Sequence, residues 1–127
     1  VTAAGLLAIE FFDESATASE IGTGAVVLTQ NRWAFVCMSY DGNEVAPIAQ
    51  LYVNGVADGA GATVEAGAYV AMENTATPLL VAARDLTASP AQEWEGRIAL
   101  PFIANKQLLA DEVLELHNIG RRLLRLT

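Results

Sequence analysis

The chain has little of several features that would indicate a particular class of protein. Its only cysteine is Cys37, so no disulfide can form within the chain and the fold does not rely on one. No apolar run approaches the roughly 20 residues that a membrane-spanning helix needs. Basic residues are scarce, since seven Lys and Arg stand against fifteen Asp and Glu and give a formal net charge of −8. Nucleic acid is therefore a poor candidate for a partner.

The size and composition of the chain indicate one folded domain. A chain of 127 residues is in the size range of a single domain with one core. Hydrophobic residues make up 53% of it and charged residues only 17%, which is too apolar for intrinsic disorder. We therefore treat residues 1–127 as a single domain, with strands that are covered on both faces. The N-terminus lacks the basic segment of a signal peptide, and we do not expect one there.

Alternation of apolar and polar residues predicts about eight short strands. The sequence Asn54-Gly55 between two of them predicts a tight hairpin, because both positions of that turn favour positive φ. Residues 13–23 are rich in Ser, Thr, Gly and acids and read as a solvated connection, and residues 59–67 read as a loop with a short edge strand. The predicted strands are residues 6–12, 25–28, 33–40, 48–53, 56–58, 69–72, 79–83 and 95–102.

The alternation changes to a helical period near the C-terminus. Leu109, Val113 and Leu116 are spaced i, i+4 and i+7, which predicts one short amphipathic helix over residues 108–118. Gly120 is the expected stop signal. The following leucines, up to Leu126, are expected to be buried. Within the strand at 33–40, Cys37 is expected to point inward as a small hydrophobic residue.

Three motifs occur in an order that resembles a known family. They are WAFVCMSYDG at residues 33–42, LYVNG at 51–55, and Gly-Arg-Ile at 96–98 ahead of the short helix. Together they resemble the laminin G-like branch of the concanavalin A-like lectin and glucanase superfamily, with a pentraxin-related pattern, over about residues 32–120. The resemblance implies an all-β fold, an antiparallel β-sandwich of jelly-roll type with one short C-terminal helix.

The resemblance also implies a function and an assembly. It implies a non-catalytic module that binds a carbohydrate or a protein surface, in an extracellular or virion-associated location. Related domains carry more strands before the tryptophan motif, so the sandwich is expected to be short at its N-terminus. Either another chain or a removed segment supplies those strands, or a homo-oligomer covers the exposed edges. The alternative function is a structural or attachment subunit of a larger assembly, such as a phage tail or virion.

The strongest candidate for ligand contact is Trp94. Carboxylates flank it, and a tryptophan at the end of a loop can hold the face of a sugar ring while its neighbours bind hydroxyl groups. Glu93, Arg84 and Asn54 complete the predicted ligand-binding set. Trp33 opens a predicted strand among apolar neighbours, and we interpret it as a core residue.

Calcium is the cofactor that we consider, because oxygen ligands are closely spaced in one turn. The predicted metal ligands there are Asp41, Asn43 and Glu44, with Asp58 as a weaker additional ligand.

Catalysis has less support than binding. Glu93 and Glu95 have the i, i+2 spacing that puts two carboxylates on one strand face. The Glu-x-Asp-x-x-Glu arrangement of the glucanase branch is absent, however, so we do not predict an enzyme.

Overall fold

The structure is a computed structural model that describes residues 1–41, 49–59, 64–70, 80–82, 84–85, 90–91 and 94–126. These residues form two compact units. The larger unit comprises Val1–Glu73 and Ala104–Thr127, and the smaller one comprises Asn74–Ile103.

The first sheet of the larger unit contains β1 (Leu6–Asp13), β2 (Ala18–Val27) and β6 (Val64–Ala66), in the order β1-β2-β6. Both pairings are antiparallel, and Asp13 pairs with Ala18 where the β1–β2 hairpin closes. The short edge strand predicted within residues 59–67 is thus confirmed as β6. The prediction of a solvated connection over residues 13–23 is wrong, because only residues 14–17 form the turn.

The second sheet contains β3 (Val36–Tyr40), β4 (Ala49–Val53) and β5 (Val56–Gly59), in the order β3-β4-β5. All its pairings are antiparallel. Asn54 and Gly55 connect β4 to β5 with φ of 53° and 79°, so the predicted hairpin is confirmed. β3 begins three residues later than predicted.

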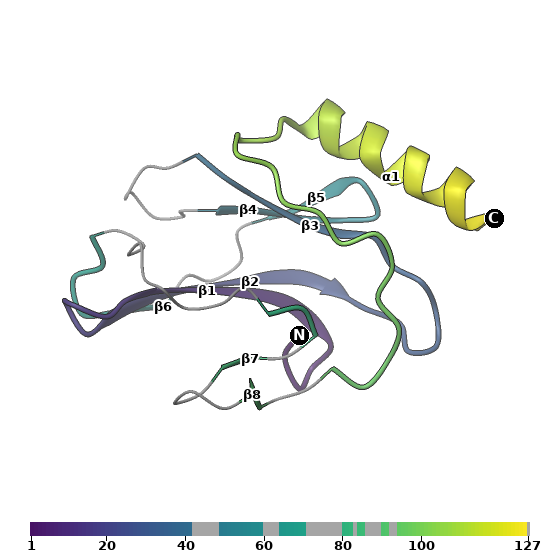
Figure 1. The fold of residues 1–127 in the computed structure, drawn as a ribbon. Coiled ribbons are helices and arrows are strands. Elements are labelled where there is room, and N and C mark those ends of the chain that lie inside the picture. The colour runs from purple at the N-terminus through teal and green to yellow at the C-terminus, as the bar shows by residue number, and fades with distance from the viewer. Residues whose placement is uncertain are drawn as a thin grey trace. The chain divides into compact units, whose positions relative to one another are not determined.

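The two sheets face each other and enclose the first part of the core (Figure 1). Phe11 of β1 contacts Tyr40 of β3, with ring centroids 5.3 Å apart, and Tyr69, with centroids 6.4 Å apart. Ala18 and Tyr69 are buried with Phe11 in one cluster, against which Ala49 of β4 packs. The antiparallel β-sandwich that the sequence implied is therefore present.

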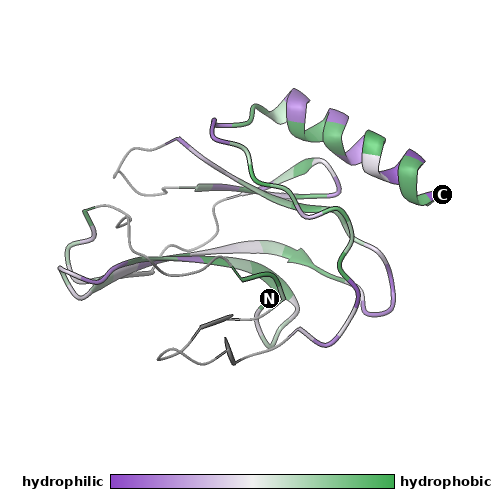
Figure 2. Ribbon diagram, viewed as in Figure 1, coloured by the Kyte–Doolittle hydropathy of each residue, from purple (hydrophilic) through white to green (hydrophobic). Residues whose placement is uncertain are grey.

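Helix α1 (Ala110–Leu124) covers the other face of the second sheet. Its apolar residues alternate with polar ones around the helix, as the banding in Figure 2 shows. Val113 is fully buried and forms a second cluster with Tyr52 and Leu108. Cys37 packs half-buried against that cluster, as expected, and burial raises the pKa of its thiol. The second sheet is thus covered on both faces.

The helix is longer than the sequence predicted. Glu112 accepts a hydrogen bond from the N–H of Leu109 at 2.9 Å and so caps the first turn. The helix continues through Gly120 and ends at Arg125, which has a φ of 53° and donates its N–H to the last turn. The prediction that the final leucines are buried is wrong, since Leu123 is 66% exposed on the helix surface. No helix among the described residues is both long and apolar enough to cross a membrane.

The smaller unit contains only short strands in its described residues. β7 (Arg84–Asp85) pairs antiparallel with β8 (Pro90–Ala91). The strands predicted at 79–83 and 95–102 are not found at residues 80–82 and 95–102, and residues 69–70 of the strand predicted at 69–72 are not in a strand either. The remaining parts of these predictions lie outside the described residues.

Candidate ligand-binding surface

Trp94 is held at its backbone and exposes its ring. Its N–H donates a hydrogen bond to the carbonyl of Ala82 at 2.7 Å, and 47% of the residue is exposed. The indole lies over Gly96, where a Cβ atom would stand 2.6 Å from the indole nitrogen. A side chain at position 96 would displace the ring. The sequence Trp94-Glu95-Gly96 therefore fixes a half-exposed aromatic surface beside a carboxylate.

The smaller unit carries two of the four predicted ligand contacts among its described residues. Arg84 lies in β7, opposite Ala91 of β8, in the same unit as Trp94. Glu93 lies outside the described residues. Glu95, which follows Trp94, is exposed. An aromatic face, a cationic residue and a carboxylate thus come from one short stretch of chain.

Asn54 belongs to the larger unit and has a structural role there. Its side-chain oxygen accepts a hydrogen bond from the N–H of Phe35 at 3.0 Å, and its own N–H donates to the carbonyl of Phe35 at 2.8 Å. These two bonds fasten the β4–β5 hairpin to the segment before β3. The side-chain acceptor of Asn54 is therefore engaged within the fold.

Trp33 is not in the core, contrary to the sequence interpretation. It is 46% exposed, because β3 starts only at Val36 and Trp33 precedes the ladder. The two tryptophans of the chain are therefore almost equally exposed and lie in different units. Because its exposure is similar, Trp33 is a matched control for any test of Trp94.

The predicted calcium turn is only partly described. Asp41 is exposed immediately after β3, whereas Asn43 and Glu44 lie outside the described residues. Within the part of the chain that the structure describes, no group of three or more His, Cys, Asp or Glu side chains has an arrangement suited to a metal ion. The calcium site stays a prediction.

Asp58, the additional metal candidate, connects the two sheets. It is only 6% exposed, and its Oδ1 accepts hydrogen bonds from the N–H groups of Ala25 at 3.1 Å and Val26 at 2.8 Å. Its Oδ2 lies against Gly24, where a Cβ atom would stand only 1.9 Å away. β5 is thus tied to β2 by a carboxylate that only a glycine at position 24 can accommodate.

A buried polar cluster at the other end of the first sheet was missed by the sequence analysis. Asp13 and Glu20 are buried on the face that packs against the second sheet. Asp13 accepts hydrogen bonds from Ser15 at 2.9 Å and from the N–H of Val70 at 3.2 Å. Burial raises the pKa of Tyr69 to about 12, helped by the adjacent Tyr40 hydroxyl and by both carboxylates. The alternation within β1 puts Asp13 on the same face as Phe11, and the pairing of β1 with β2 puts Glu20 opposite Phe11.

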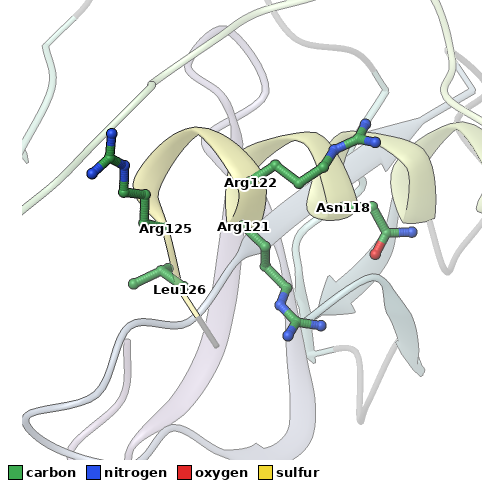
Figure 3. Close-up of a pocket in the computed structure, with 5 residues that line it drawn as sticks. All are labelled: Asn118, Arg121, Arg122, Arg125 and Leu126. Carbon is green, nitrogen blue, oxygen red and sulfur yellow. The ribbon is translucent and has the colours of Figure 1, made fainter.

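A shallow depression of about 570 Å³ lies at the C-terminal end of α1 (Figure 3). Figure 3 shows the guanidinium groups of Arg121, Arg122 and Arg125 pointing away from one another. Basic residues in the last turn complement the negative end of the helix dipole, which accounts for their position. The depression is lined by Asn118, Arg121, Arg122, Arg125 and Leu126.

Comparison with known proteins assigns the family. A family model described as the concanavalin A-like lectin/glucanases superfamily matches residues 1–114. The chain belongs to this superfamily. The match covers both sheets, the smaller unit and the start of α1, so the family extends over most of this lectin-like domain.

One solved structure has a similar fold. It is the structure of residues 221–444 of an S-layer domain-containing protein from Clostridium thermocellum, with a TM-score of 0.55 and 18% sequence identity. The similarity covers 92% of this lectin-like domain and 65% of the other chain. At that identity it shows a common fold alone. The search of curated proteins found no match.

Proposed function

We propose that this domain is a non-catalytic module that binds glycans, with Trp94 as the principal contact. The observation that carries the proposal is the half-exposed indole of Trp94, anchored through the Ala82 carbonyl. An aromatic ring with one free face can pack on the apolar face of a sugar, while Arg84 and Glu95 offer hydrogen bonds to its hydroxyl groups. Membership of a lectin and glucanase superfamily supports a sugar over other ligands of similar size.

The non-catalytic part of the proposal rests on the arrangement of carboxylates. A glycosidase needs two carboxylates that face one scissile bond from fixed positions. Glu93 and Glu95 share only an i, i+2 spacing, and the glucanase arrangement of acids is absent from the sequence. Incubation with the glycans that bind should therefore release no product, and any hydrolysis that Glu95→Gln abolishes would overturn this part.

A glycan array tests the contact directly. Wild-type protein, Trp94→Ala and Trp33→Ala are applied to the same array. Trp94→Ala is expected to lose at least tenfold in affinity for every glycan that binds, whereas Trp33→Ala keeps wild-type affinity. Unchanged binding by Trp94→Ala, or equal losses in both variants, would contradict the proposal.

A second candidate is a subunit of a larger assembly, such as a virion, a phage tail or a surface layer. The observation that favours it is the apolar segment at the end of the smaller unit, where Ile98, Leu100, Phe102 and Ile103 are all exposed. Exposed apolar residues in an extended segment can be covered by a neighbouring chain. The similar fold of an S-layer domain-containing protein agrees with this candidate.

Light scattering separates the two candidates. A homo-oligomer that persists at low micromolar concentration supports the assembly role, and a monomer supports the self-contained glycan-binding module. The measurement is repeated with calcium and with a chelator, because a mass that depends on calcium would support the ligand set predicted around Asp41.

A further inference from the structure

His117, the only histidine of the chain, lies where α1 contacts the β4–β5 hairpin. Its ring is tilted against that of Phe35, with centroids 5.6 Å apart. A Cβ atom at Gly55 in the hairpin turn would stand 2.9 Å from Nδ1 of His117 and 3.1 Å from its Cβ. The imidazole therefore packs directly on the turn, and the glycine makes that contact feasible.

Among the described residues, the buried side of the imidazole has no hydrogen-bond partner. Nδ1 of His117 is shielded from solvent and forms no hydrogen bond with any described residue. A neutral imidazole can present an acceptor nitrogen there at moderate cost. A protonated imidazole would place an unpaired N–H donor and a positive charge in this half-buried contact, and shielding an unpaired charge from water is unfavourable.

The charged and titratable groups around this contact do not compensate a positive charge. On α1 itself, Arg121 lies one turn after His117 and adds a like charge. On β3 and β4, burial raises the pKa of Cys37 and of Tyr52, so both stay neutral at acidic pH. On β5, Asp58 is turned toward β2. Among the described residues, no carboxylate forms an ion pair with His117.

The two halves of α1 are held in different ways. At the N-terminal end, the hydroxyl of Ser39 donates to the carbonyl of Leu108 at 2.7 Å and accepts from its N–H at 2.9 Å. Val113, one turn before His117, is completely buried. Beyond His117, Leu123 and Leu124 are exposed. The contact of His117 with the hairpin therefore lies between the anchored N-terminal half of the helix and its exposed last turn.

We propose that protonation of His117 releases the C-terminal half of α1 from the β4–β5 hairpin, while the Ser39–Leu108 pair holds the N-terminal half in place. The domain thereby carries an acid-sensitive helix. This inference is independent of the glycan-binding function, because it involves neither Trp94 nor the smaller unit.

The direction of the pH dependence follows from linkage. Burial, and secondarily the charge of Arg121, lower the pKa of His117 below its ordinary value of 6.5. A released imidazole takes up a proton near that ordinary value, whereas the docked one does so only at lower pH. The docked helix is therefore fully favoured above pH 6.5. As the pH falls below 6.5, the ratio of released to docked helix increases by up to about tenfold per pH unit.

The test is a pH titration of the wild-type protein by NMR, between pH 7.5 and 5, with amide hydrogen exchange across α1. The expected result is a His117 pKa below 6.5 and a loss of protection in the second half of the helix as the pH falls. Residues near Val113 should keep their protection. A His117 pKa of 6.5 or above, or uniform protection of α1 across this range, would overturn the proposal.

Two variants make the test specific. His117→Phe keeps a neutral ring and should retain helix protection at both pH 7.5 and pH 5. His117→Lys carries a permanent charge and should lose protection after position 117 at both values. If His117→Phe loses protection with acid as the wild type does, the acid response comes from other groups and the proposal fails. The wild-type titration decides the matter even if a variant does not fold.

Discussion

The two units of this domain use similar sequence patterns with different results. In the larger unit, alternating segments form strands of up to ten residues that bury Phe11, Leu51 and Tyr52 between layers. In the smaller unit, a comparable alternation at Ile98, Leu100 and Phe102 leaves all three side chains exposed. The difference shows that alternation of apolar and polar residues favours a strand but does not by itself form one. A segment also has to pair with a neighbouring strand.

The two units also differ in what their polar and aromatic side chains do. In the larger unit they hold strands and turns together, and in the smaller unit they are available for binding. Polar side chains in the larger unit, such as Asp13, Asn54 and Asp58, are engaged in hydrogen bonds that join strands and turns. In the smaller unit, Trp94 is anchored through its backbone N–H, packs its ring over Gly96 and exposes nearly half of its surface. Substitutions in the larger unit should therefore act on stability, and Trp94 substitutions on ligand binding.

The largest expected effect is at Gly24, where the two sheets are joined. Gly24→Ala places a methyl group on the Asp58 carboxylate and should destabilise the domain by about 3 kcal/mol, through overpacking and the loss of two hydrogen bonds to a charged group. Chemical denaturation measures the change. In a double-mutant cycle with Asp58→Ala, the two costs should not add, because the shortened side chain removes the clash. Strict additivity would argue against this contact.

Val113→Ala should have the next largest effect. Its side chain is fully buried between α1 and the second sheet, and removing two methyl groups there should cost about 2 kcal/mol in the free energy of unfolding. Glu115→Ala, on the exposed side of the same helix, is the matched control and should change stability by less than about 0.5 kcal/mol. Equal effects of the two substitutions would mean that α1 is not docked as described.

Gly120→Ala should stabilise the domain. Gly120 is inside α1, and a Cβ atom at this position would meet no other atom within 4 Å. Because alanine is the better helix former, the gain should be about 1 kcal/mol, read as a higher denaturation midpoint. A loss of stability would indicate that the helix ends before this position, as the sequence predicted.

The smallest expected effect concerns Glu112. Its hydrogen bond from the Leu109 N–H, and then its contact with Lys106, lower the pKa of its carboxyl below the ordinary value. The stabilisation is therefore complete above the ordinary glutamate pKa and is lost as the pH falls through the lowered one. Glu112→Gln should reduce this pH dependence slightly. A Glu112 pKa at or above the ordinary value, measured by NMR, would contradict the assignment.

The sequence predicted those parts of the fold that depend on local signals. The hairpin at Asn54-Gly55, the strands next to it and the start of the helix follow from turn chemistry, alternation and the helical period of Leu109, Val113 and Leu116. These features need no information about distant parts of the chain. The family resemblance then supplied the sandwich arrangement, which no local pattern specifies.

The errors arose where distant contacts determine the outcome. The start of β2 was missed because Glu20 reads as a solvated acid, yet its strand position between β1 and β6 buries it. The end of α1 was misplaced because Gly120 reads as a stop, although a glycine inside a helix costs only about 1 kcal/mol. For the candidate site, the sequence could select Trp94 but could not assign Asn54 to the hairpin, because its bonds to Phe35 span 19 positions.

The most direct test of the difference between the two units is amide hydrogen exchange across the whole domain, with and without a glycan identified on the array. We predict slow exchange in β1, β2 and β4 under both conditions. Residues 94–103 should exchange rapidly in the free protein and gain protection when the glycan binds. If residues 94–103 exchange as slowly as the sandwich strands, or if the glycan protects the sandwich and leaves that segment unchanged, the assignment of binding to the smaller unit is contradicted.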